Sequence, residues 1–250
     1  MIQSRQQFSS RILNWLDIVA ITAWGVLLLS YWLTGKLGLL IHPRYFGLSV
    51  IAGFGLLVVG ALGGRQLMRS HPVSVRHFTL FPPGWMSSLL LATACLGLLV
   101  TPQPFASHTA LQRGINEPLA LTRSQPQTFR ANAQPEARSL IDWVRTLDVY
   151  PEPDAYAGQK VKVQGFVVHS PEMPDQYLTI SRFAITCCAA DAYPVGLPVK
   201  LQQSRRAYPP DTWLEVEGKM VTENLQNKRQ LTIQAKSLKP ISEPKNPYAY

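Results

Sequence analysis

Three long apolar runs in the first hundred residues constrain the fold more than any other feature of this chain. They cover about residues 16–34, 45–64 and 84–101, and the central part of each lacks charged side chains. A helix of roughly 20 apolar residues crosses the bilayer core of about 30 Å. Helices that are apolar on every side leave no polar face for water, so the sequence predicts three transmembrane helices.

Positive charge in the short flanking segments predicts the sidedness of these helices. The tail before the first run and the loop between the second and third runs together carry five Arg residues. The loop between the first and second runs carries only Lys36 and Arg44. Because Lys and Arg collect on the cytoplasmic side, we expect the N-terminus in the cytoplasm and the segment after the third run outside it.

The same distribution explains the net charge of +9. Residues 1–102, the expected membrane domain, contain seven Lys or Arg and a single acidic residue, Asp17, whereas residues 103–250 are nearly balanced. A nucleic-acid-binding domain concentrates its basic excess on its folded surface, so we predict the lipid bilayer as a partner and no nucleic acid. Asp17 is expected to cap a helix or face headgroups; burial in the membrane would instead indicate an ion path.

The remaining chain is expected to contain a Pro-rich linker (103–135), a soluble β-rich domain (136–240) and a C-terminal tail (241–250). The linker lacks apolar periodicity, and a helix is predicted over 136–148. Five strand-like runs follow, at 160–168, 177–185, 197–201, 213–221 and 231–238. Five short strands separated by turn residues favour a small OB-like five-stranded β-barrel. The predicted fold class is therefore an α+β membrane protein, with three transmembrane helices, one further helix and this barrel.

The segment from Arg182 to Ala192 contains the vicinal residues Cys187 and Cys188, followed by Asp191. Two thiolates and a carboxylate are ligands that zinc accepts, and His169 could complete the set if the barrel brings it close. Two other interpretations remain open. Adjacent cysteines can form a strained, easily reduced disulfide, which favours redox chemistry, or they can pack as small apolar side chains. Arg182 could pair with Asp191.

Other residues carry weaker signals. Gly60 and Gly64 lie four apart in the second run, where a helix of this chain or of a partner can approach closely. His71 and His77 are expected to be solvated loop residues rather than cation ligands. The sequence contains no P-loop, dinucleotide-binding fingerprint, Gly-x-Ser-x-Gly or His-Glu-x-x-His motif, so we predict no enzymatic activity.

The cysteine segment resembles the YcgQ-like family of bacterial permease subunits, whose hallmark is a Cys-Cys-x-Ala-Asp-Ala motif. Residues 156–167 also match the approach to that family's first strand. The motif residues in this chain are Arg182, Phe183, Cys187, Cys188, Asp191, Pro194 and Gly196.

This resemblance implies an accessory subunit of a two-component permease in the bacterial inner membrane, with a larger multi-span protein as partner. The extracytoplasmic β domain would handle a metal ion, such as zinc, or a small solute. The alternative is a membrane-anchored thiol-redox or metal-relay protein, and an oligonucleotide-binding module is a third hypothesis.

Overall fold

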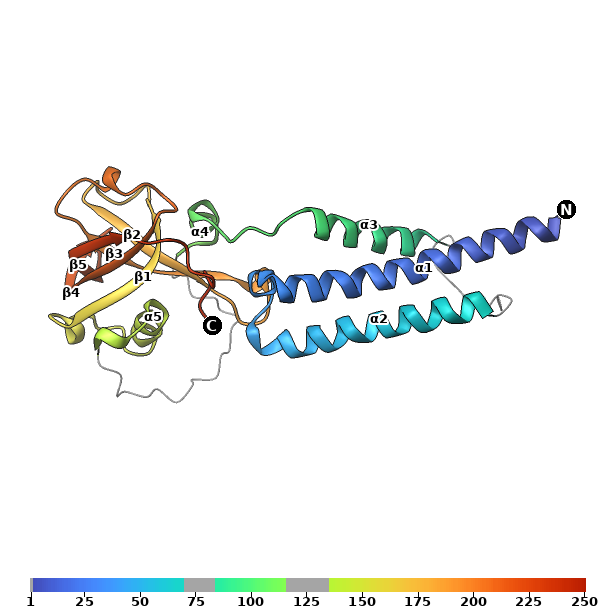
Figure 1. The fold of residues 1–250 in the computed structure, drawn as a ribbon. Helices are drawn as coiled ribbons and strands as arrows, with labels where there is room; N and C mark the ends of the chain where they lie inside the picture. The colour runs from blue at the N-terminus through green and yellow to red at the C-terminus, as the bar shows by residue number, and fades with distance from the viewer. Residues whose placement is uncertain (1, 70–83, 116–134) are drawn as a thin grey trace. The chain divides into compact units, whose positions relative to one another are not determined.

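A computed structural model describes residues 2–69, 84–115 and 135–250, the first ten of these by their backbone alone. The chain divides into two compact units, Met1–Gln103 and Pro104–Tyr250. The first unit is helical, and the second contains the five described strands (Figure 1). The protein is therefore α+β. His71 and His77 lie outside the described residues.

Long helices build the first unit. They are α1 (Ile2–Leu33), α2 (Phe46–Arg69) and α3 (Trp85–Leu99), with the 3-10 turns η1 (Lys36–Leu39) and η2 (Pro43–Tyr45) between the first two. Two stretches, Ile12–Leu33 and Pro43–Arg69, are long and apolar enough to cross a membrane. α3 is apolar but only 15 residues long, so the third expected span stays a prediction.

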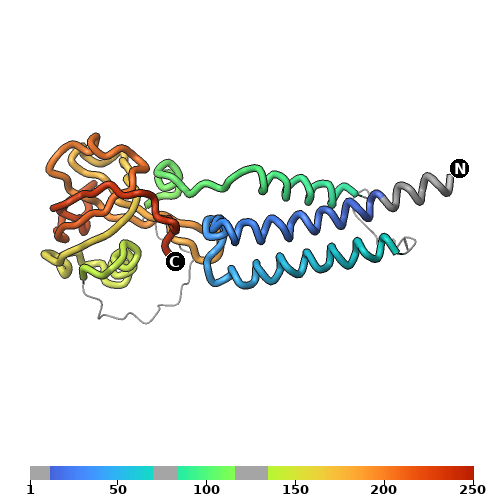
Figure 2. The backbone as a smooth tube through the Cα atoms, viewed as in Figure 1, coloured from blue at the N-terminus to red at the C-terminus, as the bar shows by residue number. Residues whose placement is uncertain are grey.

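Glycines let α1 and α2 pack closely side by side (Figure 2). A Cβ atom added at Gly60 would collide with the hydroxyl of Thr22 on α1, and one at Gly53 would lie 3.0 Å from Leu29. Gly60 therefore packs against the chain's own first helix. Gly64 is buried, but among the described residues a Cβ atom there would meet nothing within 4 Å.

Three polar side chains spaced seven residues apart on α1 bind α3. The pairs are Asp17 with the Ser87 hydroxyl, Trp24 Nε1 with the Leu90 carbonyl at 2.9 Å, and the Tyr31 hydroxyl with the Gly97 carbonyl. A spacing of seven puts the α1 residues on one helix face. From the first pair to the third, the residue numbers increase along both helices, so α1 and α3 run parallel.

Asp17 lies in the interior of α1, so the expectation that it caps a helix start is wrong, whereas its position facing headgroups stays a prediction. Its carboxylate accepts a hydrogen bond from Ser87 in the first turn of α3. That helix begins after Gly84, which has no side chain to cap it. Asp17 thus brings negative charge to the positive end of the α3 dipole.

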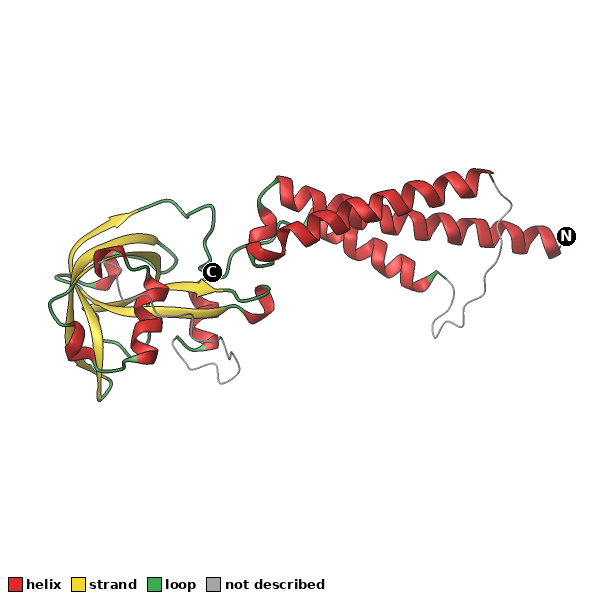
Figure 3. Ribbon diagram, turned by 90° about the horizontal axis from the view of Figure 1, so that it is seen from below, coloured by secondary structure: helices red, strands yellow, loops and turns green. Residues whose placement is uncertain are grey.

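The second unit is a closed five-stranded barrel (Figure 3). Its strands are β1 (Lys160–Val168), β2 (Tyr177–Ala184), β3 (Tyr193–Lys200), β4 (Trp213–Leu225) and β5 (Lys228–Pro240). They are hydrogen-bonded in the order β1-β2-β3-β5-β4, and β1 also pairs with β4. All pairs are antiparallel except β3 with β5.

The observed strands are longer than expected where turn residues interrupt the sequence pattern. β3 begins at Tyr193 rather than at residue 197, although it contains Pro194 and Pro198. β3 pairs with β5 only at Val199 and Lys200. Both prolines lie outside this pairing, so their missing N–H groups cost no hydrogen bond to β5. β4 and β5 extend to a tight hairpin turn whose central residues have positive φ.

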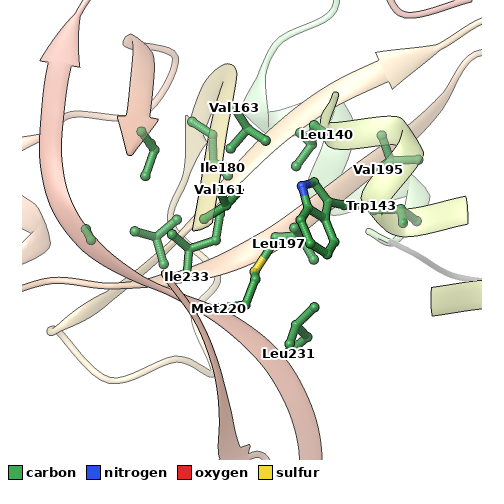
Figure 4. Close-up of a cluster of buried hydrophobic side chains, with 14 of the residues drawn as sticks. Leu140, Trp143, Val161, Val163, Ile180, Val195, Leu197, Met220, Leu231 and Ile233 are labelled. Atoms are coloured by element: carbon green, nitrogen blue, oxygen red, sulfur yellow. The ribbon is translucent and has the colours of Figure 1, made fainter. Parts of the chain in front are cut away.

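The core of the barrel unit is completed by α5 (Leu140–Val149). Trp143 is fully buried and lies among Leu140, Val195 and Leu197 (Figure 4). Ser139 caps this helix in a reciprocal hydrogen-bond pair with Asp142. The helix therefore begins later than the predicted residue 136, which lies in the 3-10 turn η3 (Pro135–Ala137).

Part of the expected linker is folded against the barrel. Residues Ser107–Arg113 form α4, in which Ala110 is fully buried. The Ser107 N–H donates to the Asp211 carboxylate at 2.5 Å. The prediction of an extended linker over 103–135 is therefore wrong for α4. The residue that binds α4, Asp211, lies about a hundred positions later in the chain, so no local sequence pattern predicts this contact.

Candidate thiol site in the loop between β2 and β3

Cys187, Cys188 and Asp191 lie together in the loop that connects β2 to β3. Their ligand atoms are all within 4.8 Å of one another, and the two sulfur atoms are 3.6 Å apart. Both thiols are free; Cys187 is exposed, and Cys188 is half-buried. The structure therefore brings together the three residues that the sequence marked.

The Asp191 carboxylate organises this loop. It accepts hydrogen bonds from the N–H groups of Thr186 (3.3 Å), Cys187 (2.7 Å) and Cys188 (3.2 Å), and from the Thr186 hydroxyl. Asp191 also ends the short 3-10 turn η5 (Ala189–Asp191). Burial raises the pKa of Asp191, but these hydrogen bonds outweigh it and leave the pKa below its ordinary value. The group is thus an anion that holds the loop backbone.

This anion affects the neighbouring thiol. Hydrogen bonding to Asp191 and to Cys188 raises the pKa of Cys187 to about 11. The thiolate is the nucleophilic form of cysteine, and at neutral pH Cys187 is almost entirely protonated. Cys187 is therefore not an activated thiolate, although a metal ion can still displace its proton.

The C-terminal tail fixes the end of β2 just before the site. The Ala249 N–H donates to the Phe183 carbonyl at 2.7 Å, and the Ile185 N–H donates to the Ala249 carbonyl at 3.1 Å. Ala184 and Ala249 thereby form a parallel bridge. The tail, which the sequence analysis set apart from the β domain, continues the sheet and supports the cysteine loop.

Arg182 binds the tail rather than Asp191. Its guanidinium donates to the carbonyls of Pro247 (3.1 Å) and Asn246 (2.6 Å), and it lies 5.8 Å from the ring centre of Trp213. The prediction that Arg182 pairs with Asp191 is therefore wrong, because the Asp191 carboxylate accepts hydrogen bonds from the loop N–H groups instead.

An aromatic cluster packs beneath this end of the barrel. The ring centre of Phe183 lies 5.1 Å from that of Phe105 and 5.7 Å from that of Phe166, on which it is stacked. Tyr248 packs edge-on against Phe183. The Tyr248 hydroxyl accepts a hydrogen bond from the Phe105 N–H at 3.1 Å. No sequence pattern predicts this cluster, because its members come from distant segments and share no periodicity.

The last two motif residues serve the barrel itself. In the β2–β3 register Pro194 lies opposite Phe183 and Gly196 lies opposite Ser181. A Cβ atom at Gly196 would lie 2.8 Å from the Thr179 methyl group, so this position needs glycine for close packing.

His169 lies apart from the thiols. It follows Val168, which pairs with Thr179 near the start of β2, whereas the cysteines follow the opposite end of that strand. Its Nε2 atom lies 2.9 Å from the Tyr208 carbonyl. Among residues 2–69, 84–115 and 135–250, no other His, Cys, Asp or Glu joins the group, so the structure does not supply the expected fourth ligand.

Comparison with known proteins found one family model that matches the barrel unit and one relative that is similar over most of the chain. Residues 137–250 match the family model described as "DUF1980 C-terminal domain", a region that includes α5, the barrel and the tail. A protein of Streptococcus mutans named "Putative two-component membrane permease complex subunit" is 26% identical over 257 residues. The alignment covers 87% of this chain and 92% of the relative. The chain is thus similar over most of its length, including parts of both units, to a protein named as a permease subunit.

Proposed function

We propose that this chain is a non-enzymatic accessory subunit of a two-component permease. The observation that carries the proposal is the alignment with the streptococcal protein, which includes 92% of that relative and both units of this chain. The relative is named as one subunit of a membrane complex, so the expected partner is a second, multi-span membrane protein. The YcgQ-like motif supports the same assignment through its resemblance.

The proposed topology has three membrane spans, with the N-terminus in the cytoplasm and the barrel on the other side of the inner membrane. α1 and α2 have the required length. The case for α3 is its parallel pairing with α1, in which the polar contacts extend from Asp17 to Tyr31 on α1. Polar side chains that bind a neighbouring helix stabilise helix association in lipid.

The barrel is the proposed ligand-handling part. We interpret it as OB-like because its order is β1-β2-β3-β5-β4 with the parallel β3–β5 pair, and α5 covers the core. The Cys187–Cys188–Asp191 site is the part of the barrel that would handle a metal ion or small solute. The thiol-redox alternative has less support, because the Cys187 thiol is protonated at neutral pH.

Affinity purification from native membranes tests the complex. The chain would be tagged at its chromosomal locus, solubilised in mild detergent and quantified by mass spectrometry. We expect one multi-span membrane protein to co-purify in a fixed ratio and to form a single particle of matching mass. A different tagged inner-membrane protein provides the control. A particle that contains this chain alone would contradict the proposal.

A further inference from the structure

The spacing of the Cys187 and Cys188 sulfur atoms suits a tetrahedral soft cation. Zinc–sulfur bonds of about 2.3 Å at a tetrahedral angle place two sulfur ligands about 3.8 Å apart. The observed separation is 3.6 Å. A disulfide would need about 2.05 Å, and a linear two-sulfur complex with the same bonds about 4.6 Å. The pair therefore needs almost no movement to chelate such an ion.

Asp191 leaves the ion's remaining positions open. Its two oxygen atoms accept three N–H groups and one hydroxyl, which already fill a carboxylate's roughly four lone-pair sites, and these bonds remain when Cys187 gives up its thiol hydrogen bond to Asp191 on losing its proton. Its role is therefore to position the backbone of both cysteines rather than to bind the ion. Structural zinc sites are closed by four protein ligands, whereas sites with open positions admit water or substrate.

Solvent can reach the sulfur pair directly. Cys187 is exposed, and Cys188 is half-buried. In the described part of the chain, the group includes no further ligand that would close the site. An exposed dithiolate with open positions can take up an ion and release it to another ligand set.

We propose that Cys187 and Cys188 form an open, exchangeable site for a soft divalent cation of the zinc class, and that such an ion is the cargo of the complex. On binding, each thiol loses its proton, so two S–H bonds are replaced by two metal–sulfur bonds and two protons are released to water. The cargo part rests on the proposed permease function; the binding part does not.

Cadmium titration of the full-length chain in detergent tests the binding. Cadmium is a soft zinc analogue whose thiolate complexes absorb in the ultraviolet. After chelator treatment, we expect one ion per chain, with a thiolate-to-cadmium band that saturates at this ratio. Cys187→Ser and Cys188→Ser should each weaken binding at least tenfold, and the double variant should lose the band. Cys95→Ser, which removes the exposed cysteine of α3, is the matched control and should bind like the original chain.

Asp191→Asn separates positioning from ligation. The variant should bind cadmium more weakly but keep the sulfur band and the one-to-one ratio, because both thiols remain. Circular dichroism verifies that each variant is folded. If a cysteine variant fails to fold, protection of Cys187 and Cys188 from alkylation by cadmium in the unmutated chain provides the same readout.

Equal binding by the original chain and the double cysteine variant would overturn the inference, as would full alkylation of both thiols in saturating cadmium. These measurements use the isolated chain, so they are independent of the partner. Binding without co-purification would contradict the permease assignment alone. Co-purification without binding would contradict only the metal site.

Discussion

At the residue scale, single carboxylates bind the cysteine loop and the first turn of a helix. Asp191 gathers the N–H groups of the cysteine loop, and Asp17 binds the first turn of α3. In both cases an anion satisfies or neutralises groups at the start of a turn or helix, where the backbone N–H donors point outward.

Removing the Asp191 carboxylate should loosen the cysteine loop. Asp191→Ala leaves three N–H groups without their acceptor, so we expect a loss of about 1–2 kcal/mol, as for other capping side chains. Thermal unfolding of the detergent-solubilised chain measures it. Asp175→Ala is the control, because the Asp175 side chain is exposed and its ion pair with Arg205 is long at 4.0 Å. Equal midpoints for the two variants would contradict the capping role.

The lowered pKa of Asp154 indicates that the folded chain loses stability in acid. Hydrogen bonds from Thr222 and Arg229 hold the pKa of Asp154 below its ordinary value of 3.8. A group whose folded-state pKa is lowered stabilises the fold above 3.8, and the contribution disappears as the pH falls through the folded-state pKa. Thermal midpoints from pH 6 to pH 2 should therefore fall more steeply in the original chain than in Asp154→Asn. Parallel curves would contradict the prediction.

At the scale of elements, packing depends on which side of a helix or strand a residue occupies. On α2, Gly60 faces α1, whereas a Cβ atom at Gly55 would meet nothing within 4 Å. On the barrel, the tail residues next to Tyr248 extend the end of β2. Neither role follows from residue type alone.

The α1–α2 contact should tolerate leucine at one glycine and not at the other. Gly60→Leu inserts a side chain against Thr22, and such overpacking costs about 1–3 kcal/mol. Gly55→Leu is the matched control on the same helix. The midpoint of thermal unfolding in detergent should fall for Gly60→Leu and stay unchanged for Gly55→Leu. An equal loss in both would show that the contact is absent.

The tail should be required for an ordered thiol loop. Tyr248 is 3% exposed, so Tyr248→Ala should destabilise the barrel by about 3–4 kcal/mol. Tyr248→Phe keeps the ring and loses only the hydrogen bond to Phe105, which is worth about 1 kcal/mol. Limited proteolysis should cleave near residues 186–192 much faster in the alanine variant. Unchanged cleavage there would contradict the supporting role of the tail.

At the scale of the whole molecule, an apolar helical unit and a barrel unit share one chain. Their surfaces differ in kind: large apolar side chains such as Leu48, Ile51 and Phe54 are exposed on α2, whereas exposed ion pairs such as Lys162 with Glu217 mark the barrel. Exposed apolar helices suit lipid, and a charged barrel surface suits water.

The proposed sidedness predicts which cysteines an impermeant reagent reaches. In a Cys95→Ser background, a membrane-impermeant maleimide should label Cys187 in intact spheroplasts at alkaline pH, because the proposed topology places the barrel outside the cytoplasm. A chain with Gln3→Cys and no other cysteine should react only after permeabilisation. Labelling of Cys187 that requires permeabilisation would reverse the proposed topology.

Local periodicity in the amino-acid sequence is enough to predict the features that repeat along the chain. The apolar runs of α1 and α2, the alternation in β1 and β4 and the helical spacing of α5 follow from periodicities that neighbouring residues create. The vicinal cysteines and the nearby carboxylate were likewise recognisable, because four residues of loop cannot separate them far.

Features that depend on residues far apart in the chain follow from the three-dimensional packing alone. It placed Asp17 against Ser87, folded α4 onto the barrel, joined the tail to β2 and removed His169 from the thiols. Each of these outcomes is set by contacts between segments far apart in the chain. Such contacts leave no periodic trace in the sequence around either partner, so no local pattern could have revealed them.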